Sequence, residues 1–113
     1  MPPREWRFRV EDILQSIAAI QEYTRDRDFA SFSADRRTLD AVMYNFVIIG
    51  EAAANVPEEI QAASPEIPWT SMRKMRNVGA HVYFGLKLPI LWDTIQNDLP
   101  PLPPMLRTLL SRP

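Results

Sequence analysis

The chain has 113 residues, a net charge of −1 at pH 7, 46% hydrophobic and 24% charged residues, no cysteine and a single histidine. This composition fits one folded domain and excludes a disulfide framework, and it argues against a zinc site within one chain and against non-specific nucleic-acid binding by the whole surface. Residues 1–10 lack the apolar run of a signal peptide, and the longest apolar run, Phe46 to Gly50, cannot span a bilayer, so we expect a cytoplasmic protein without membrane contact.

Apolar residues recur at the spacing of an α-helix along most of the sequence. The first helix carries them from Trp6 to Ile20 and should end near Tyr23 or Thr24. Residues 25–33 follow as a connection whose two phenylalanines turn toward the core. The pattern therefore predicts one long helix and a connection at the start of the chain.

The second helix is unusually apolar in its second half. Ser33 or Asp35 should cap its start, and Pro57 should end it. Residues 46–49 cover nearly the whole circumference, which indicates either a central core helix or a core face combined with a dimer face. Gly50 would let another helix approach closely. The pattern alone leaves both interpretations open.

Two shorter helices follow. The first covers residues 58–63 and has Pro57 in a first-turn position. After a rigid connector that contains prolines, Thr70 or Ser71 should cap the next helix, which ends between residues 79 and 81.

Pro89 begins a fifth helix, whose apolar residues continue to Leu99. A proline-rich tail over residues 100–113 comes next, with a last helical turn or two after the prolines. Because the connections are short, the sequence predicts an all-α, antiparallel bundle of about five helices that forms one domain over residues 1–113.

The stretch around the histidine is the candidate site. From Ile67 to Trp92 there is no aspartate or glutamate. His81 titrates near neutral pH and can transfer a proton, while Arg76 offers planar, bidentate contacts to phosphate oxygens. These residue types fit metal-independent cleavage of RNA by its own 2′-hydroxyl, which needs a base, a cation and an acid. The basic residues of the window are Arg73, Lys74, Arg76 and Lys87, and Arg73 and Lys74 are candidates for binding RNA.

This chemistry usually needs two groups that transfer protons, but one chain holds one histidine. A symmetric dimer would place His81 from each subunit in a shared cleft. Tyr83 is the other candidate, as a donor or a positioning group. On an ideal helix Arg76 and Tyr83 share a face and His81 is rotated away, so the groups converge only if the helix ends or distorts, or if a dimer completes the site.

The same residues also have plainer interpretations. By composition alone, His81 caps or packs near a helix end, and Arg73 and Lys74 form a solvated face. Glu51, a carboxylate in a nearly apolar stretch, either forms a salt bridge or faces solvent, or it orients Arg76 or His81 in the cleft. The residue pattern leaves these alternatives open.

Arg76, His81 and Tyr83 form an R-x4-H-x-Y motif, and other segments accompany it in a fixed order. The ordered set, over about residues 7–100, resembles the HepT-like toxins, a branch of the HEPN superfamily. Its segments are Asp12-Ile13-Leu14, residues 35–42 and 48–53, Pro65-Glu66-Ile67-Pro68-Trp69, Met75-Arg76-Asn77, Tyr83-Phe84-Gly85 and Trp92-Asp93-Thr94-Ile95.

The resemblance implies an all-α homodimer in which two R-x4-H motifs face a shared cleft. It implies a metal-independent endoribonuclease, without a cofactor, that acts as the toxin of a type II toxin–antitoxin system. The implied partners are an RNA substrate and a minimal nucleotidyltransferase antitoxin. In some members of the family, that antitoxin transfers AMP to the motif tyrosine and silences the toxin.

Carried over to this chain, the resemblance implies that Arg76 holds the phosphate and that His81 acts as acid or base. Asn77 would hydrogen-bond in the site, and Tyr83 would be the residue that accepts AMP. Two other functions compete with this one. The first is a non-catalytic nucleotide- or RNA-binding dimer that is the substrate or regulator of a nucleotidyltransferase, and the second is a structural dimer whose basic patch binds nothing.

Overall fold

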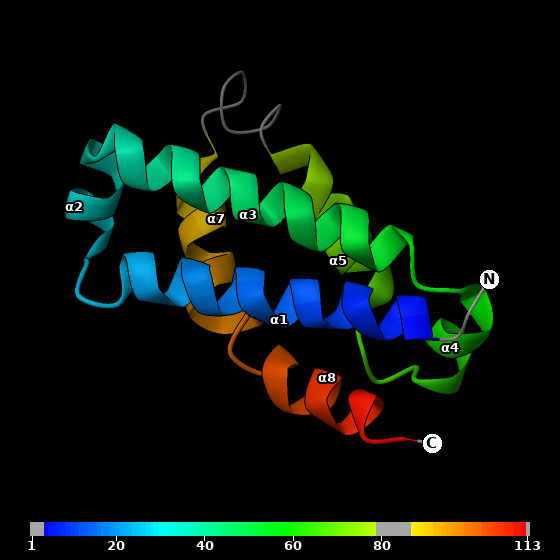
Figure 1. Ribbon diagram of the computed structural model, residues 1–113. Coiled ribbons are helices and arrows are strands. Elements are labelled where there is room, and N and C mark those ends of the chain that lie inside the picture. The colour runs from blue at the N-terminus through cyan, green and yellow to red at the C-terminus, as the bar shows by residue number, and fades with distance from the viewer. Residues whose placement is uncertain (1–3, 79–86, 113) are drawn as a thin grey trace.

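The computed structural model describes residues 4–78 and 87–112, and every regular element within these ranges is helical, which confirms the all-α prediction (Figure 1). No helix in these ranges is long and apolar enough to cross a membrane. The elements are α1 (Arg4–Thr24), α2 (Phe29–Ala34), α3 (Arg36–Ala54), α4 (Glu58–Ala63), α5 (Trp69–Lys74), the 3-10 turn η1 (Met75–Asn77), α7 (Leu88–Asp93), the π-helical turn η2 (Thr94–Asp98) and α8 (Leu102–Leu110).

Helices α1 and α3 lie side by side in opposite directions and form the centre of the fold (Figure 1). On α1, the buried apolar residues recur every three or four positions, as in an amphipathic helix. The predicted first helix and its end at Thr24 are confirmed. The buried apolar residues of α1 are Trp6, Val10, Ile13, Ile17 and Ile20.

Helix α3 contacts α1 on one side and α5 and η1 on another, so the interpretation as a central core helix is confirmed. Phe46 and Ile49 are fully buried, whereas Val47 and Ile48 are partly exposed. Tyr44 on the outer side is 68% exposed. A dimer face on this outer side stays a prediction.

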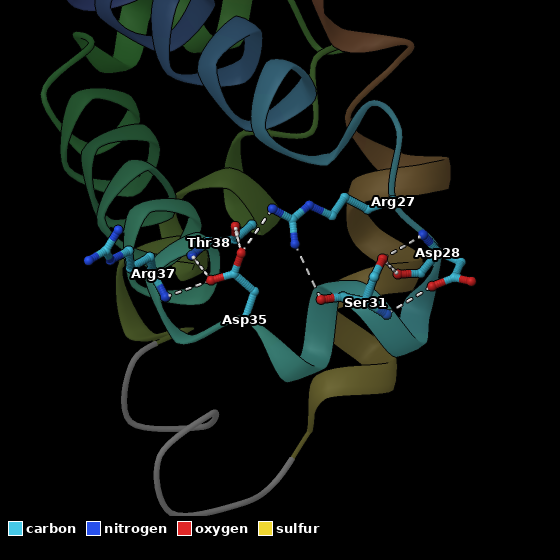
Figure 2. Close-up of polar contacts among 6 residues, drawn as sticks. All are labelled: Arg27, Asp28, Ser31, Asp35, Arg37 and Thr38. Carbon is cyan, nitrogen blue, oxygen red and sulfur yellow. Dashed lines mark hydrogen bonds and ion pairs between the residues drawn. The ribbon is translucent and has the colours of Figure 1, made fainter.

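Two aspartates determine where the helices begin at the turn between α1 and α3 (Figure 2). Asp28 accepts a hydrogen bond from the Ser31 backbone N–H at 2.8 Å, and the Ser31 hydroxyl accepts one from the Asp28 N–H, which is a reciprocal capping box. Asp35 accepts hydrogen bonds from two backbone N–H groups of α3 and from the hydroxyl of Thr38, and it forms an ion pair with Arg27 at 2.9 Å. Of the two predicted caps of α3, the aspartate is the one used.

The prediction of a connection over residues 25–33 was wrong in part, because α2 forms within it. Phe32 of α2 is fully buried and its ring lies 4.8 Å from that of Trp92, as the inward turn of this segment predicted. Phe29 remains 37% exposed. The short helix therefore carries one aromatic anchor into the core.

The C-terminal segment contains more helix than the predicted turn or two. Helix α8 starts at Leu102, and its prolines stand in the first turn, where a missing N–H breaks no helical hydrogen bond. Three of its leucines are buried against α1. The Arg7 guanidinium donates to the backbone oxygens of Leu110 and Arg112, both at 2.7 Å, and so ties the start of α1 to the end of α8.

Helix α5 begins earlier than predicted. Pro68 occupies the N-cap position without a side-chain hydrogen bond, so the predicted caps Thr70 and Ser71 were wrong. The Trp69 indole N–H donates to the Ser64 backbone oxygen at 3.0 Å and fixes this start. The turn then tightens into η1, and the predicted end of the helix between residues 79 and 81 lies outside the described residues.

Candidate functional site

Arg76 lies on η1 in direct backbone contact with α3. A Cβ added at Gly50 would lie 2.3 Å from the backbone nitrogen of Arg76 and 2.8 Å from its Cα, so only glycine fits at this position. The element that approaches the glycine is thus η1 of the same chain. This contact fixes the backbone from which the Arg76 side chain extends.

Glu51, the next residue of α3, lies beside the Arg76 side chain. Its Oε1 is 4.0 Å from Arg76 Nη1, and the Glu51 and Arg76 side chains are 58% and 46% exposed. The predicted salt bridge of Glu51 is therefore present, with Arg76 as its partner, and the predicted orienting role of Glu51 stays a prediction. An exposed pair of this kind is worth about 0–1 kcal/mol, so it contributes little to stability and leaves the guanidinium open to solvent.

Arg73 belongs to a hydrogen-bond network that connects three helices. Its guanidinium donates to the Gln61 amide oxygen on α4 and, at 3.1 Å, to the hydroxyl of Thr70. The Gln61 amide nitrogen in turn donates to the backbone oxygens of Ala53 and Val56 at 3.2 and 2.9 Å, where α3 ends. Gln61 thus adds a second partner to the Ala53 oxygen, which already accepts from the Val56 N–H, and bonds the Val56 oxygen just past the helix end, while Arg73 holds Gln61 in place.

Lys74 lies in different surroundings from Arg73. It is exposed and lines a pocket of about 360 Å³ between α3, α5, η1 and α7. Phe46 forms part of the wall, and Lys87, the residue before α7, adds a second positive charge. Both lysines lie in the acid-free window of the sequence, but the pocket itself was not predicted.

The residues that the structure describes include only part of the predicted site. Arg76, Glu51 and the exposed Asn77 lie together at η1 and the facing turn of α3. His81 and Tyr83 lie outside the described residues, so their predicted roles stay predictions. Gln61 was not predicted as a site residue, because nothing in the sequence of the short helix α4 indicates that it bonds Arg73, 12 residues later.

The arrangement can bind an anion. The Arg76 guanidinium has a fixed backbone, is half-exposed and has planar donors that match phosphate oxygens. Two exposed lysines lie on the neighbouring wall and raise the local positive potential. The fold and these groups define a helical protein with a candidate phosphate-binding site next to its single histidine-bearing segment.

The sequence matches the family described as ribonuclease HepT-like over residues 13–109, so the chain belongs to that family and the resemblance is confirmed. It is 42% identical over 93 residues to a protein of Thermococcus cleftensis named "Probable ribonuclease HepT", with 82% of this chain and 84% of that protein covered.

Two other relatives extend the comparison. A Methanocaldococcus jannaschii protein named "Putative RNase" is 36% identical over 100 residues, with 88% of this chain and 83% of that protein covered. A Caldanaerobacter subterraneus protein, also named "Putative RNase", is 31% identical over 103 residues, with 91% and 92% covered. No solved structure matches the chain.

Proposed function

We propose that the protein is a metal-independent endoribonuclease and the toxin of a type II toxin–antitoxin system. The observation that carries this proposal is the position of Arg76. Its backbone touches Gly50, and its half-exposed guanidinium lies beside Glu51, just before the histidine-bearing segment of the sequence. Membership in the HepT-like family, whose relatives are named as ribonucleases, supports the assignment of RNA as substrate.

In the proposed reaction, Arg76 binds the non-bridging oxygens of the scissile phosphate and stabilises the charge that develops on them. A base takes the proton of the 2′-hydroxyl, the 2′-oxygen attacks phosphorus, and the 5′-oxygen leaves with a proton from an acid. The products are a 2′,3′-cyclic phosphate and a 5′-hydroxyl end. His81 fills one of the two proton-transfer roles, and the same histidine of a second subunit fills the other in a homodimer.

The remaining predicted residues support this centre. Asn77 and Glu51 are proposed to position the phosphate and the guanidinium. Of the two basic residues predicted to bind RNA, we propose Lys74 as the main contact, because hydrogen bonds to Gln61 and Thr70 hold Arg73. A minimal nucleotidyltransferase is the proposed antitoxin, and transfer of AMP to Tyr83 would place a charged, bulky group two residues from His81.

A second function is favoured by the pocket beside Arg76. Its apolar wall and two lysines would suit a nucleotide. In this alternative the protein is a non-catalytic nucleotide- or RNA-binding dimer, and it is either the substrate or the regulator of a nucleotidyltransferase. This alternative predicts that the pure, unmodified protein leaves RNA intact and that Tyr83, not His81, carries the biological effect.

The test is RNA cleavage in excess chelator by unmodified wild-type protein beside His81→Ala. Intact mass establishes that no AMP is attached, and light scattering reports the oligomeric state of both proteins. Cleavage by the wild type alone, with 2′,3′-cyclic phosphate ends, is the expected result. Intact RNA with both proteins, across single-stranded RNA and tRNA, would instead support the binding module.

A further inference from the structure

The pocket beside η1 gathers more chemistry than the RNA contact proposed for Lys74. Both lysines of the chain line it, Lys74 from α5 and Lys87 from the residue before α7. Phe46 and Ile90 provide apolar surface, and Asp98 of η2 provides a carboxylate. This combination is the pattern expected for a nucleotide. The two cations match the phosphate, the apolar wall matches the face of the base, and the carboxylate, which only accepts hydrogen bonds, matches the edge of the base.

The location ties this pocket to the proposed cleavage site. Phe46 lies one helical turn before Gly50 on α3, and Gly50 is the residue that Arg76 touches. Met75, the residue before Arg76, lines the pocket itself. The pocket and the proposed phosphate-binding arginine are therefore built on neighbouring residues of the same two elements, α3 and η1.

The size and exposure also suit a single base. The volume of about 360 Å³ is at the lower end of the range of roughly 300–1,000 Å³ that ligand pockets occupy. Ile90 is 60% exposed at the rim, whereas Phe46 deeper in the wall is 1% exposed. Unstacked RNA bases bind on such apolar and aromatic surfaces.

The wall that carries Asp98 is a wide turn. The Leu99 backbone N–H donates to the Thr94 oxygen at 3.0 Å, five residues back, and turns of this π-helical type are frequent at functional sites. Within residues 4–78 and 87–112, no ion pair or hydrogen bond engages the charged groups of Asp98, Lys74 or Lys87. No group in the described part of the chain therefore competes with a ligand for these three charges.

A carboxylate distinguishes among bases because it only accepts hydrogen bonds. Guanine presents two neighbouring donors, N1–H and the N2 amino group, which match the two carboxylate oxygens. On their Watson–Crick edges, adenine, cytosine and uracil each place an acceptor next to any donor. These bases therefore offer Asp98 one hydrogen bond at most, and the lone pairs of the neighbouring acceptor face those of the second carboxylate oxygen.

We propose that this pocket is a guanine subsite, which binds an unstacked guanine next to the phosphate held by Arg76. Asp98 accepts from the guanine edge, Ile90 at the rim contacts its ring in front of the wall that the buried Phe46 supports, and Lys74 and Lys87 attract the adjoining phosphate. The assignment of the ligand as part of an RNA chain rests on the proposed ribonuclease function, whereas the guanine preference of the pocket does not.

The first test measures binding without cleavage, with guanosine 3′-monophosphate and uridine 3′-monophosphate titrated into the full-length protein. The guanosine nucleotide should bind at least about fivefold more tightly, in the range a bidentate pair gives. Asp98→Asn should weaken the guanosine nucleotide about tenfold and leave the uridine nucleotide within twofold. Asp26→Asn is the matched control, since Asp26 is an exposed carboxylate in the turn after α1.

Equal affinities of the wild type for the two nucleotides would overturn the proposal, as would equal effects of the two Asn variants. If Asp98→Asn fails to fold, Lys87→Gln provides the second variant. It should weaken both nucleotides equally while leaving the affinity for guanosine, which lacks phosphate, within twofold. A loss of affinity for guanosine of the same size would contradict the placement of the phosphate.

The second test separates a base within RNA from a free nucleotide. A uridine-rich single-stranded RNA with one guanine should be cut beside the guanine by the wild type and at scattered positions by Asp98→Asn. Scattered cleavage by the wild type, despite guanine preference in binding, would overturn the RNA subsite. Intact RNA with preserved guanine preference would contradict the ribonuclease function and support the guanine site itself.

Discussion

The backbone of Arg76 rests on Gly50 so closely that a Cβ at position 50 would lie 2.3 Å from the Arg76 nitrogen. Glu51 then lies beside the guanidinium, with its carboxylate oxygen 4.0 Å away. Two consecutive residues of α3 therefore contact the same arginine, Gly50 at its backbone and Glu51 at its guanidinium. Because α3 is the central helix, the arginine is positioned against a packed helix of the core rather than by a surface loop.

Gly50→Ala should reduce both stability and cleavage. In an open helix position, alanine is more stable than glycine by roughly 0.5–1 kcal/mol, but here its methyl group must displace the backbone of η1. Overpacking of this kind costs roughly 1–3 kcal/mol, so the free energy of unfolding should fall. The displacement of Arg76 should lower the cleavage rate more than the stability loss explains. Urea unfolding and single-turnover RNA cleavage measure the two effects.

Ala18→Gly supplies the control for the helix-propensity part of this change. Ala18 is an exposed residue in the middle of α1, so its exchange for glycine should cost roughly 0.5–1 kcal/mol without altering cleavage. If Gly50→Ala instead gained stability and kept full activity, the contact with Arg76 would have to be soft, and the positioning argument would fail.

Glu51→Gln should leave stability nearly unchanged, since an exposed ion pair with the two atoms 4.0 Å apart contributes at most about 1 kcal/mol. Cleavage should respond differently, because the variant loses the group that directs Arg76. We expect kcat to fall severalfold while KM stays the same or decreases, since a negative charge near the RNA phosphate is removed. An unchanged kcat would show that Glu51 is only a surface partner. Steady-state kinetics on one short RNA provides the measurement, with Glu22→Gln on the remote α1 as control.

The sequence predicted the long elements well and the short ones less well. Helix α1 and its end at Thr24 were predicted correctly, because its 21 residues repeat an apolar spacing over several turns. Helix α2 has six residues and was taken as a connection, since its signal is the Asp28–Ser31 capping box rather than a periodic pattern. The start of α5 was misplaced because Pro68 takes the N-cap position without offering a side-chain bond.

In the candidate site, too, some features could be predicted from the sequence and others could not. Arg76 could be singled out by local sequence, because it lies in an acid-free window and in a motif with His81. Its contact with Gly50 could not, because it depends on how η1 docks onto a helix that precedes it by more than 20 residues. The link from Arg73 to Gln61 is likewise tertiary, and sequence alone gave Arg73 and Lys74 the same role.

Lys74 and Arg73 should differ in how they affect RNA binding. Lys74→Gln removes an exposed charge from the pocket wall, so it should weaken RNA binding and reduce the slope of log K against log salt by about 1. Arg73→Gln should leave this slope nearly unchanged and lower the thermal unfolding midpoint, because it breaks the bond to Gln61. Filter binding of RNA at several salt concentrations tests this. Equal changes of slope in the two variants would show that Arg73 also contacts phosphate.

Asp35 should make the fold sensitive to acid. Its hydrogen bonds from the Thr38 hydroxyl and backbone N–H, and then from Arg27, lower the pKa of its carboxyl below the ordinary value of 3.8. A carboxyl whose pKa is lower in the folded state contributes stability that is complete above its unfolded pKa and is lost as pH falls through the folded value. The urea midpoint should thus hold steady above about pH 5 and decline as pH falls below 3.8. Asp28, whose pKa is lowered by its bonds from Ser31, should add to the decline.

Asp35→Asn isolates the contribution of this cap. The amide still accepts a hydrogen bond from the first turn of α3, but it loses the charge that faces Arg27 at 2.9 Å. The variant should therefore be less stable than the wild type at pH 7, and the difference should shrink as the pH falls through the lowered pKa of the wild-type carboxyl. Asp26→Asn, in the exposed turn after α1, is the control and should leave the pH profile unchanged. A stability difference for Asp35→Asn that stays constant from pH 7 to pH 2 would mean that the side chain acts through shape and hydrogen bonding rather than through its charge.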